Sequence, residues 1–422
     1  MPDLNNQSDE PKTTKRLVLF FTGLDIAGPE RYHLMMRQQH RYYSRRFNVP
    51  MSISPLNKNE RPNNHFSSFT LEADWPEGKT RTHYYISDTQ QEVEREAARS
   101  NFSRFPSYLY WYLKFFLNGV LPSLFKRQIR AAIVFSVPLI GLVLRALLTL
   151  VLFIIAASLV TITQTAQWLS YVLMGLAVFL ILLTVGRLGN YLKTFYEPHL
   201  ADSLIYQCKL TDDKTAALEK EIARFSQEAI EIIEIEKPDE VLIIGHSCGC
   251  FHSIPVYKTI LEAHQSTKHL TNYKMLHTTF GSLIPYTVSY KKNRLFREHC
   301  LKLLENEQTN WIDFCAPQDP LSVPYIRLDK DYDLDLGEPL PASYDVRSAV
   351  FGEVFSAKKL NQFKYNPLRM HFQYLTANDV AGKFDFFYII SHPSALINQL
   401  HMPANIWRSK REMNKASNVN AN

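Results

Sequence analysis

The feature that most constrains this chain is a long uncharged apolar segment in its middle. Between residues 131 and 186 the only ionisable side chains are those of Arg145 and Tyr171. Two stretches, 142–163 and 168–186, are each long enough to cross a bilayer as a helix, and a short uncharged loop joins them. Because a helix satisfies its own backbone hydrogen bonds in hydrocarbon, the pattern predicts a two-helix transmembrane hairpin.

The alternative for this segment is a buried helical hairpin inside a soluble domain, although a buried helix rarely stays apolar on every face for so long. Arg145 constrains the depth of the first helix, since an arginine is costly at the bilayer centre and much less so near an interface. We therefore place Arg145 near the membrane boundary, with 131–144 as an apolar lead-in.

Basic residues on both sides of the segment set its orientation. Lys126, Arg127 and Arg130 precede it, Arg187 and Lys193 follow it, and the connecting loop carries no charge. The positive-inside rule then places both flanks, and with them the soluble segments, on the cytoplasmic face of a multi-pass protein. Just upstream, the aromatic run Ser107–Phe116 fits either an interfacial helix or a core helix under the sheet.

The rest of the chain alternates short apolar runs with amphipathic stretches, which predicts a mostly parallel α/β sheet with flanking helices. Segments 16–125 and 195–407 form this domain in two parts, separated by the membrane segment 126–194. A polar disordered segment, 1–15, and a polar tail, 408–422, lie at the ends. Expected strands are 16–21, 80–87, 240–244, 274–279, 311–314 and 349–355, expected helices are 29–46, 212–235 and 251–263, and 330–346 is expected to be a surface loop.

Composition excludes several classes of protein. The chain has 422 residues and a net charge of +6, and this mild, scattered excess gives no reason to expect a nucleic acid partner. Five cysteines are too few for a disulfide scaffold and indicate a reducing compartment. The sequence holds no nucleotide-binding motif and no cluster with metal-ligand spacing, so we expect neither a cofactor nor a metal.

The chemistry is carried by Gly245-His246-Ser247-Cys248-Gly249, which lies between a predicted strand and a predicted helix. In a G-x-S-x-G turn of this kind a strained backbone raises the serine hydroxyl, and the glycines avoid collisions with the neighbouring elements. The following helix directs its N-terminal N–H groups at the same place. The alternative is a tight structural turn.

With this motif the two soluble segments resemble the α/β-hydrolase superfamily of serine hydrolases. The resemblance implies a catalytic acid after a later strand and a histidine after the last strand, in the order Ser, Asp, His. Asp319 is the expected acid because it lies in the loop that ends the strand 311–314. Asp313 is the rival, but it lies within that strand.

His371 is the expected base, since it follows Asp319 and the last predicted strand. His392 is its main competitor, and His277 is disfavoured because it precedes Asp319 inside a strand. The resemblance also implies an oxyanion hole made by the backbone N–H groups of Cys248 and Leu24, with Leu24 in the loop after the first strand.

Together these features predict a membrane-anchored serine hydrolase whose Ser247, His371 and Asp319 cleave an acyl ester or thioester, with a lipid or amphiphile from the bilayer as substrate. Two alternatives stay open: an acyltransferase on the same scaffold, and a non-catalytic membrane-anchored binding protein. The oligomeric state is not predicted. The helix 29–46 carries Arg31, Arg37, Arg41, Arg45 and Arg46, which fit either a solvated face or contact with anionic lipid headgroups.

Overall fold

A computed structural model of the chain describes residues 13–23, 28–58, 65–89, 101–127, 129–162, 168–169, 171–180, 183, 197–212, 215–266, 273–323, 328, 343–382, 384–394 and 396. The chain divides into two compact units. Unit 1 comprises Met1–Glu94 and Gln207–Asn422, and unit 2 comprises Arg95–Tyr206. Residues 95–125, assigned above to the sheet domain, therefore cluster with the helices of unit 2.

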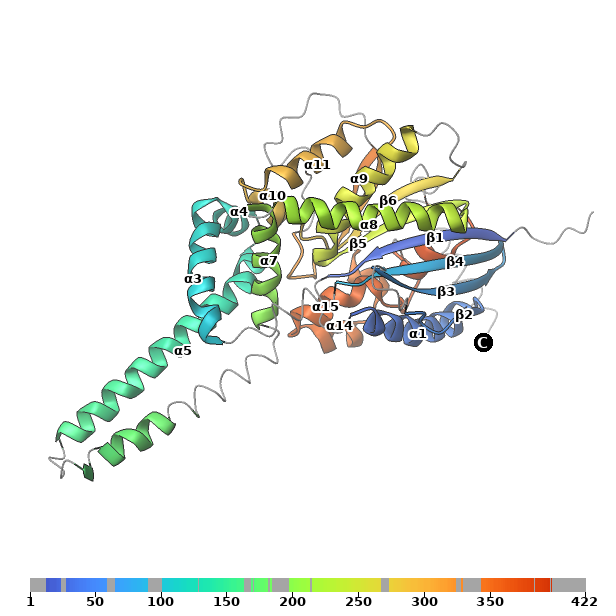
Figure 1. The fold of residues 1–422 in the computed structure, drawn as a ribbon. Coiled ribbons are helices and arrows are strands. Elements are labelled where there is room, and N and C mark those ends of the chain that lie inside the picture. The colour runs from blue at the N-terminus through green and yellow to red at the C-terminus, as the bar shows by residue number, and fades with distance from the viewer. Residues whose placement is uncertain are drawn as a thin grey trace, which may run out of the picture. The chain divides into compact units, whose positions relative to one another are not determined.

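Unit 1 is built on an eight-stranded sheet in the order β2-β3-β4-β1-β5-β6-β7-β8 (Figure 1). The strands from β4 to β8 in this order are mutually parallel, and only β3, which pairs with β2 and β4, runs antiparallel. The predicted mostly parallel sheet with flanking helices is thus confirmed. The strands are β1 Thr14–Phe21, β2 Met51–Ile53, β3 Phe66–Trp75, β4 Gly78–Ser87, β5 Glu240–His246, β6 Lys274–Phe280, β7 Asn310–Cys315 and β8 Ser343–Ser348.

Helices cover both faces of this sheet because neighbouring residues of a strand point to opposite sides. The ring of Phe20 in β1 lies 5.4 Å from Tyr32 of α1, whereas the next ring, Phe21, lies 5.6 Å from Phe225 of α8. Helices α1 and α8 therefore pack on opposite faces (Figure 1). The helices of unit 1 are α1 Gly28–Phe47, α8 Thr215–Glu236, α9 Cys250–Ser266, α10 Ile284–Ser289, α11 Arg294–Leu304, α13 Phe351–Val354, α14 Ala357–Phe363, α15 Pro367–His371 and α16 Phe386–Ser391, with short 3-10 turns η1 Ser247–Gly249 and η2 Phe372–Leu375.

The parallel register brings the carboxyl ends of the central strands to one edge. Phe21 of β1 pairs with Gly245 of β5, which in turn pairs with Thr279 of β6. At the opposite end a buried ion pair joins Arg16 Nε to Glu240 Oε2 at 2.7 Å. Loops at the carboxyl edge of an open parallel sheet are where ligands usually bind, so this edge is the place to look for a site.

Two element predictions in unit 1 are wrong. The expected strand 349–355 is a helical turn, α13, because Phe351, Val354 and Phe355 bury their side chains at helical rather than alternate spacing. The last strand is instead β8, Ser343–Ser348, whose first four residues overlap the end of the expected surface loop 330–346. Strand β1 also starts at Thr14, inside the segment expected to be disordered; the rest of that segment and the polar tail 408–422 lie outside the described residues.

Unit 2 is helical, with α3 Asn101–Leu117, α4 Val120–Arg127 and α5 Ile129–Ile162. The aromatic helix α3 packs one side into this unit, where Tyr108, Trp111 and Phe115 are buried, and exposes apolar residues on the other. Helix α3 thus belongs to unit 2, and its exposed apolar side is the surface that an interfacial helix would present to lipid. A further helix, α7 Glu197–Asp212, crosses the boundary between the units.

The predicted two-helix membrane hairpin is found only in part among the described residues. Among the described residues one helix, Ile129–Ile155, is long and apolar enough to span a membrane, and the apolar stretch Tyr171–Leu180 is shorter. The expected lead-in belongs to the same continuous helix, α5, which includes Pro138, so the candidate span begins before the predicted 142. Most of the loop expected between the two spans, and the last residues of the second one, lie outside the described residues.

Helix α5 changes its surroundings along its length. Ala131, Ala132 and Phe135 are buried within unit 2, whereas Leu144, Leu150 and Ile155 are each half exposed or more. Exposed apolar side chains also precede Arg145, at Ile133 and Ile140, so Arg145 lies within the exposed apolar surface rather than at its start.

Candidate active site

The strand-to-helix turn at Ser247 has the geometry that the motif predicts. Strand β5 ends at His246, and Ser247 adopts a φ of +57°, a left-handed conformation that is costly for a residue with a side chain. Helix α9 begins three residues later, at Cys250. Ser247 is only partly buried, unlike its neighbours on both sides, so the strained residue is the one that reaches the surface.

The two glycines of the motif are explained by close approach. A Cβ atom on Gly249 would lie 2.1 Å from the carbonyl oxygen of Phe21, and one on Gly245 would lie 2.3 Å from Ser253 Oγ. The first obstacle is backbone and cannot turn aside. The turn therefore fits against β1 and α9 only because both positions lack side chains.

Asp319 and His371, 52 residues apart in sequence, meet in a buried hydrogen bond of 2.7 Å between Asp319 Oδ2 and His371 Nδ1. The other carboxylate oxygen, Oδ1, accepts from the N–H of Leu321 at 2.9 Å, which fixes the orientation of the carboxylate. A carboxylate can only accept, so Nδ1 carries the proton and Nε2 is left as the basic nitrogen. Within the described part of the chain Nε2 is buried without a hydrogen-bond partner, so its expected bond to Ser247 Oγ is not formed in this conformation.

Several contacts place the imidazole and the serine at the same edge. The ring of His246, the residue before Ser247, lies 5.0 Å from the His371 ring, with its Nε2 3.4 Å from the carbonyl oxygen of His371. The loop after β6 touches both groups as well. A Cβ on Gly281 would lie 2.9 Å from His371 Cε1, and the N–H of Leu283 donates to the carbonyl of Ser247 at 3.5 Å.

Burial sets the protonation states of two groups close to the candidate residues, His246 and Cys250. Burial, followed by the charge of His371, holds the pKa of His246 well below its usual value, so His246 stays neutral at physiological pH. The thiol of Cys250 is no competing nucleophile, because burial and then the charge of Asp313 raise its pKa well above the usual value.

The rival acid and bases lie elsewhere. Asp313 accepts from Thr279 Oγ1 at 2.7 Å and from Ser282 Oγ at 3.4 Å, and burial raises its pKa to about 6. His277 is within 3.0 Å of Ser253 Oγ, and burial lowers its pKa to about 3. His392 stacks on Tyr388 and meets Trp75 edge to face, next to the hairpin between β3 and β4, at the end of the sheet away from Ser247.

The loop after β1 also reaches the site. A Cβ on Gly23 would lie 3.4 Å from Ser247 Cβ and 3.7 Å from Ser247 Oγ. The N–H of the preceding Thr22 is engaged with Ser87 Oγ at 3.1 Å and is not an oxyanion donor. Leu24, the expected second donor, lies outside the described residues, whereas the first, Cys248, is buried in η1 directly after the serine.

Two residues that the sequence analysis did not single out help to build the site. Tyr374 accepts from the N–H of Ala316 at 2.8 Å with its hydroxyl, and burial followed by the charge of Asp319 raises its pKa well above the usual value. Gly281 has a φ of +53° beside His371. A tyrosine three residues after the candidate histidine and a glycine at the end of a strand are the only signals of these roles in the sequence.

No three of the His, Cys, Asp and Glu side chains in the described part of the chain come together as a metal site. The five cysteines are buried, and none of them forms a disulfide. None of the comparisons with family models, curated proteins and solved structures returned a match.

Proposed function

We propose that this chain is a membrane-anchored serine hydrolase that cleaves an acyl ester or thioester with Ser247, His371 and Asp319. The observation that carries the proposal is the buried 2.7 Å bond between Asp319 and His371 at the sheet edge where Ser247 is held in a strained turn. Structural aspartate–histidine pairs are common, but this one leaves Nε2 unbonded at the same sheet edge as the partly exposed Ser247.

In the proposed mechanism Ser247 Oγ attacks the acyl carbonyl carbon while His371 Nε2 takes the hydroxyl proton. Asp319 keeps the other proton on Nδ1 and stabilises the imidazolium that forms. The N–H groups of Cys248 and Leu24 hold the oxyanion. The imidazolium then gives its proton to the departing alcohol or thiol, and a water molecule, deprotonated by Nε2, releases the acid and restores Ser247.

The fold family, the membrane anchor and the orientation in the membrane are part of the same proposal. The chain would have an α/β-hydrolase-type fold, anchored by α5 and by a second crossing that includes Tyr171–Leu180, with the catalytic unit on the cytoplasmic face. The support is the exposed apolar surface of α5 beyond Arg145 and of the second stretch, where Trp168, Leu176 and Phe179 are each more than half exposed. Such surface is favourable in lipid and unfavourable in water.

Anchoring favours a substrate that resides in the bilayer, because attachment to the same membrane raises its effective concentration at the site. We therefore propose a lipid or another amphiphile as the acyl donor.

The test is turnover by the full-length chain in lipid nanodiscs with a series of p-nitrophenyl esters of increasing acyl length. We expect hydrolysis by the unaltered chain and its loss in Ser247→Ala. Ser266→Ala, at the exposed end of α9, is the matched control and should keep full activity. Activity in Ser247→Ala equal to the control would exclude the proposed nucleophile, and release of the acyl group only to an added alcohol would favour the acyltransferase.

A further inference from the structure

The outward surface of α1 carries a concentration of positive charge that the proposed chemistry does not use. The helix contains five arginines and a single acid, Glu30, which pairs with Lys58. Arg37, Arg41 and Arg45 are exposed at intervals of four residues, on the side of the helix opposite the buried Tyr32 and Tyr43. Like charges four residues apart destabilise a helix, so solubility alone does not explain this row of three arginines.

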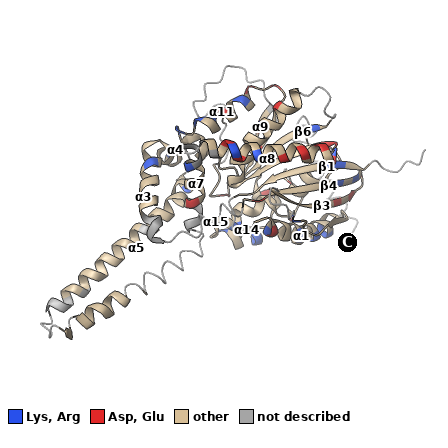
Figure 2. Ribbon diagram, in the orientation of Figure 1, with Lys and Arg blue, Asp and Glu red and all other residues tan. Residues whose placement is uncertain are grey.

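These three arginines have no ion-pair partner within the described ranges. Helices α14 and α15 extend the same charge, since they contain Lys358, Lys359 and Arg369 and no acid. Lys358, Lys364 and Arg369 are exposed. Figure 2 colours the lysine and arginine positions of the ribbon blue, several of them on α1. We call the six exposed cations Arg37, Arg41, Arg45, Lys358, Lys364 and Arg369 the basic face.

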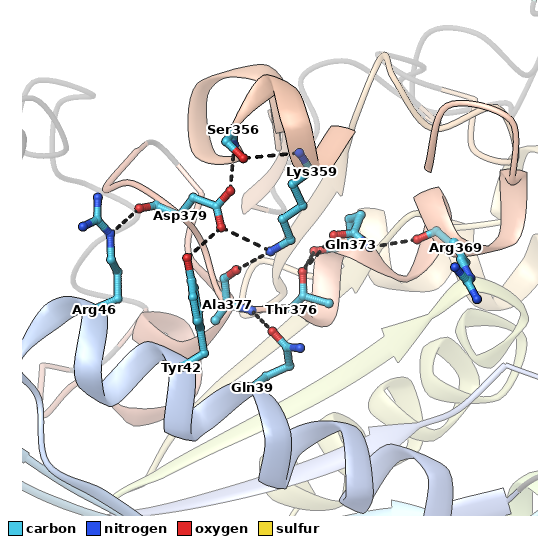
Figure 3. Close-up of polar contacts among 10 residues, drawn as sticks. All are labelled: Gln39, Tyr42, Arg46, Ser356, Lys359, Arg369, Gln373, Thr376, Ala377 and Asp379. Carbon is cyan, nitrogen blue, oxygen red and sulfur yellow. Dashed lines mark hydrogen bonds and ion pairs between the residues drawn. The ribbon is translucent and has the colours of Figure 1, made fainter. Parts of the chain in front are cut away.

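A network of hydrogen bonds joins α1 to the segment that carries α14 and α15 (Figure 3). The carboxylate of Asp379 accepts from Tyr42 of α1 at 3.0 Å and from the N–H of Ser356 at 2.8 Å, while its carbonyl oxygen accepts from Arg46 Nε at 2.6 Å. Gln39 of α1 accepts from the N–H of Ala377 at 3.0 Å. Because these bonds tie the elements to one another, the basic face is a fixed surface.

The basic face also contains apolar groups and borders the candidate site. Leu34 is 56% exposed and Tyr365 is 82% exposed, so an aliphatic and an aromatic side chain lie among the cations. Arg369 is two residues before His371, and the Arg31 guanidinium lies 4.7 Å from the ring centroid of Phe372, the next residue. Aromatic and aliphatic groups beside Lys and Arg are characteristic of surfaces that sit at the lipid headgroup level.

We propose that the basic face docks on the anionic headgroups of a bilayer and so presents the edge with Ser247 and His371 to lipid in the membrane plane. The inference rests on the proposed function, because it is the membrane anchor that supplies the bilayer as partner. Charge complementarity, the exposed aliphatic side chain of Leu34 and the proposed membrane anchor of the same chain favour an anionic lipid surface over nucleic acid.

The test uses the full-length chain in phosphatidylcholine nanodiscs with and without phosphatidylserine. A fluorophore is attached at Gln38→Cys, an exposed position between Arg37 and Arg41; the five native cysteines are buried. Headgroup-attached spin labels then report contact by quenching. We expect quenching that requires phosphatidylserine and weakens as salt rises from about 0.1 M to about 1 M, since the Debye length falls from about 10 Å to about 3 Å.

The variant Arg37→Gln/Arg41→Gln/Arg45→Gln should reduce the docking equilibrium constant on the order of 100-fold, because each basic residue near an anionic surface contributes about fivefold. Its matched control is Lys220→Gln/Arg224→Gln/Lys237→Asn, which removes three cations on and just after α8, on the opposite face of the sheet. The control should dock like the parent.

Quenching that is equal with and without phosphatidylserine, or that survives in the arginine variant, would overturn the proposal. The assay needs no turnover, so its failure is distinct from that of the proposed function. A chain that docks but hydrolyses nothing contradicts the hydrolase, and one that hydrolyses without docking contradicts only this inference.

Discussion

Replacing Asp319 by asparagine tests the role of the acid most sharply, because the structure fixes how the new amide must lie. Asp319 Oδ1 already accepts from the N–H of Leu321, so in Asp319→Asn the amide oxygen keeps that bond and the NH2 group replaces Oδ2 opposite His371 Nδ1. Nδ1 must then accept, and the proton moves to Nε2. An Nε2 that carries a proton cannot take one from Ser247.

The expected loss in kcat is about 10⁴-fold, or about 5 kcal/mol of transition-state stabilisation. The fold should persist, because the side chains are nearly isosteric. The assay is p-nitrophenyl ester hydrolysis by the full-length chain in nanodiscs, with near-UV circular dichroism as a check of packing. Asp313→Asn is the matched control, since Asp313 is also buried on the β7 side but bonds to Thr279 and Ser282, and its kcat should fall less than tenfold. A folded Asp319→Asn with kcat within tenfold of the parent would refute the assignment.

Three further predictions concern the pH dependence of stability, the position of His371 and the membrane span. Burial raises the pKa of Asp313 from 3.8 to about 6, so the folded state binds this proton more tightly than the unfolded state. Asp313 therefore contributes about 3 kcal/mol to the free energy of unfolding below pH 3.8, and this contribution is lost as the pH rises to about 6. In denaturant unfolding, the free energy of unfolding of the parent should decrease over this pH range, and that of Asp313→Asn should not. An equal pH dependence in the two proteins would contradict a buried carboxyl at this position. Gly281→Ala places a Cβ 2.9 Å from His371 Cε1 at a φ of +53°, so ester hydrolysis should fall at least tenfold. The control is Gly352→Ala, whose added Cβ would have its nearest neighbour atom 3.6 Å away and which should hydrolyse the ester nearly as the parent does. Unchanged hydrolysis in Gly281→Ala would mean that His371 is not held against this glycine. Leu150→Arg, on the exposed side of α5, should cost about 3 kcal/mol of membrane insertion, which glycosylation-tag mapping would detect as loss of the span, and intact insertion would argue against a crossing at this position.

Much of the sheet could be predicted from the sequence because its central strands are short, continuous apolar runs. The predicted cores of β1, β5, β6 and β7 all lie within observed strands. Strand β3 was missed although its residues 69–75 alternate between apolar and polar, the pattern of a half-buried strand. Strand β8 was missed because SYDVRS is mostly polar.

Residues of the candidate site could be predicted from the sequence where a local motif or their order along the chain identified them. Ser247 is defined by neighbouring residues, and Asp319 and His371 by their order along the chain. The close approach of Gly281 to His371 and the support of Ala316 by Tyr374 depend on contacts between distant segments, which one sequence does not reveal. The basic face was underestimated for the same reason, since its lysines and arginines come from α1 and from residues more than 300 positions later.

The central claim is that Ser247 is a nucleophile activated by His371, and covalent labelling measures this directly. The full-length chain is treated with a fluorophosphonate probe, and the modified peptide is identified by mass spectrometry. The account predicts a single adduct on Ser247, absent in Ser247→Ala and formed far more slowly in Asp319→Asn. A folded chain that stays unlabelled, or an adduct on another residue that persists in Ser247→Ala, would contradict it.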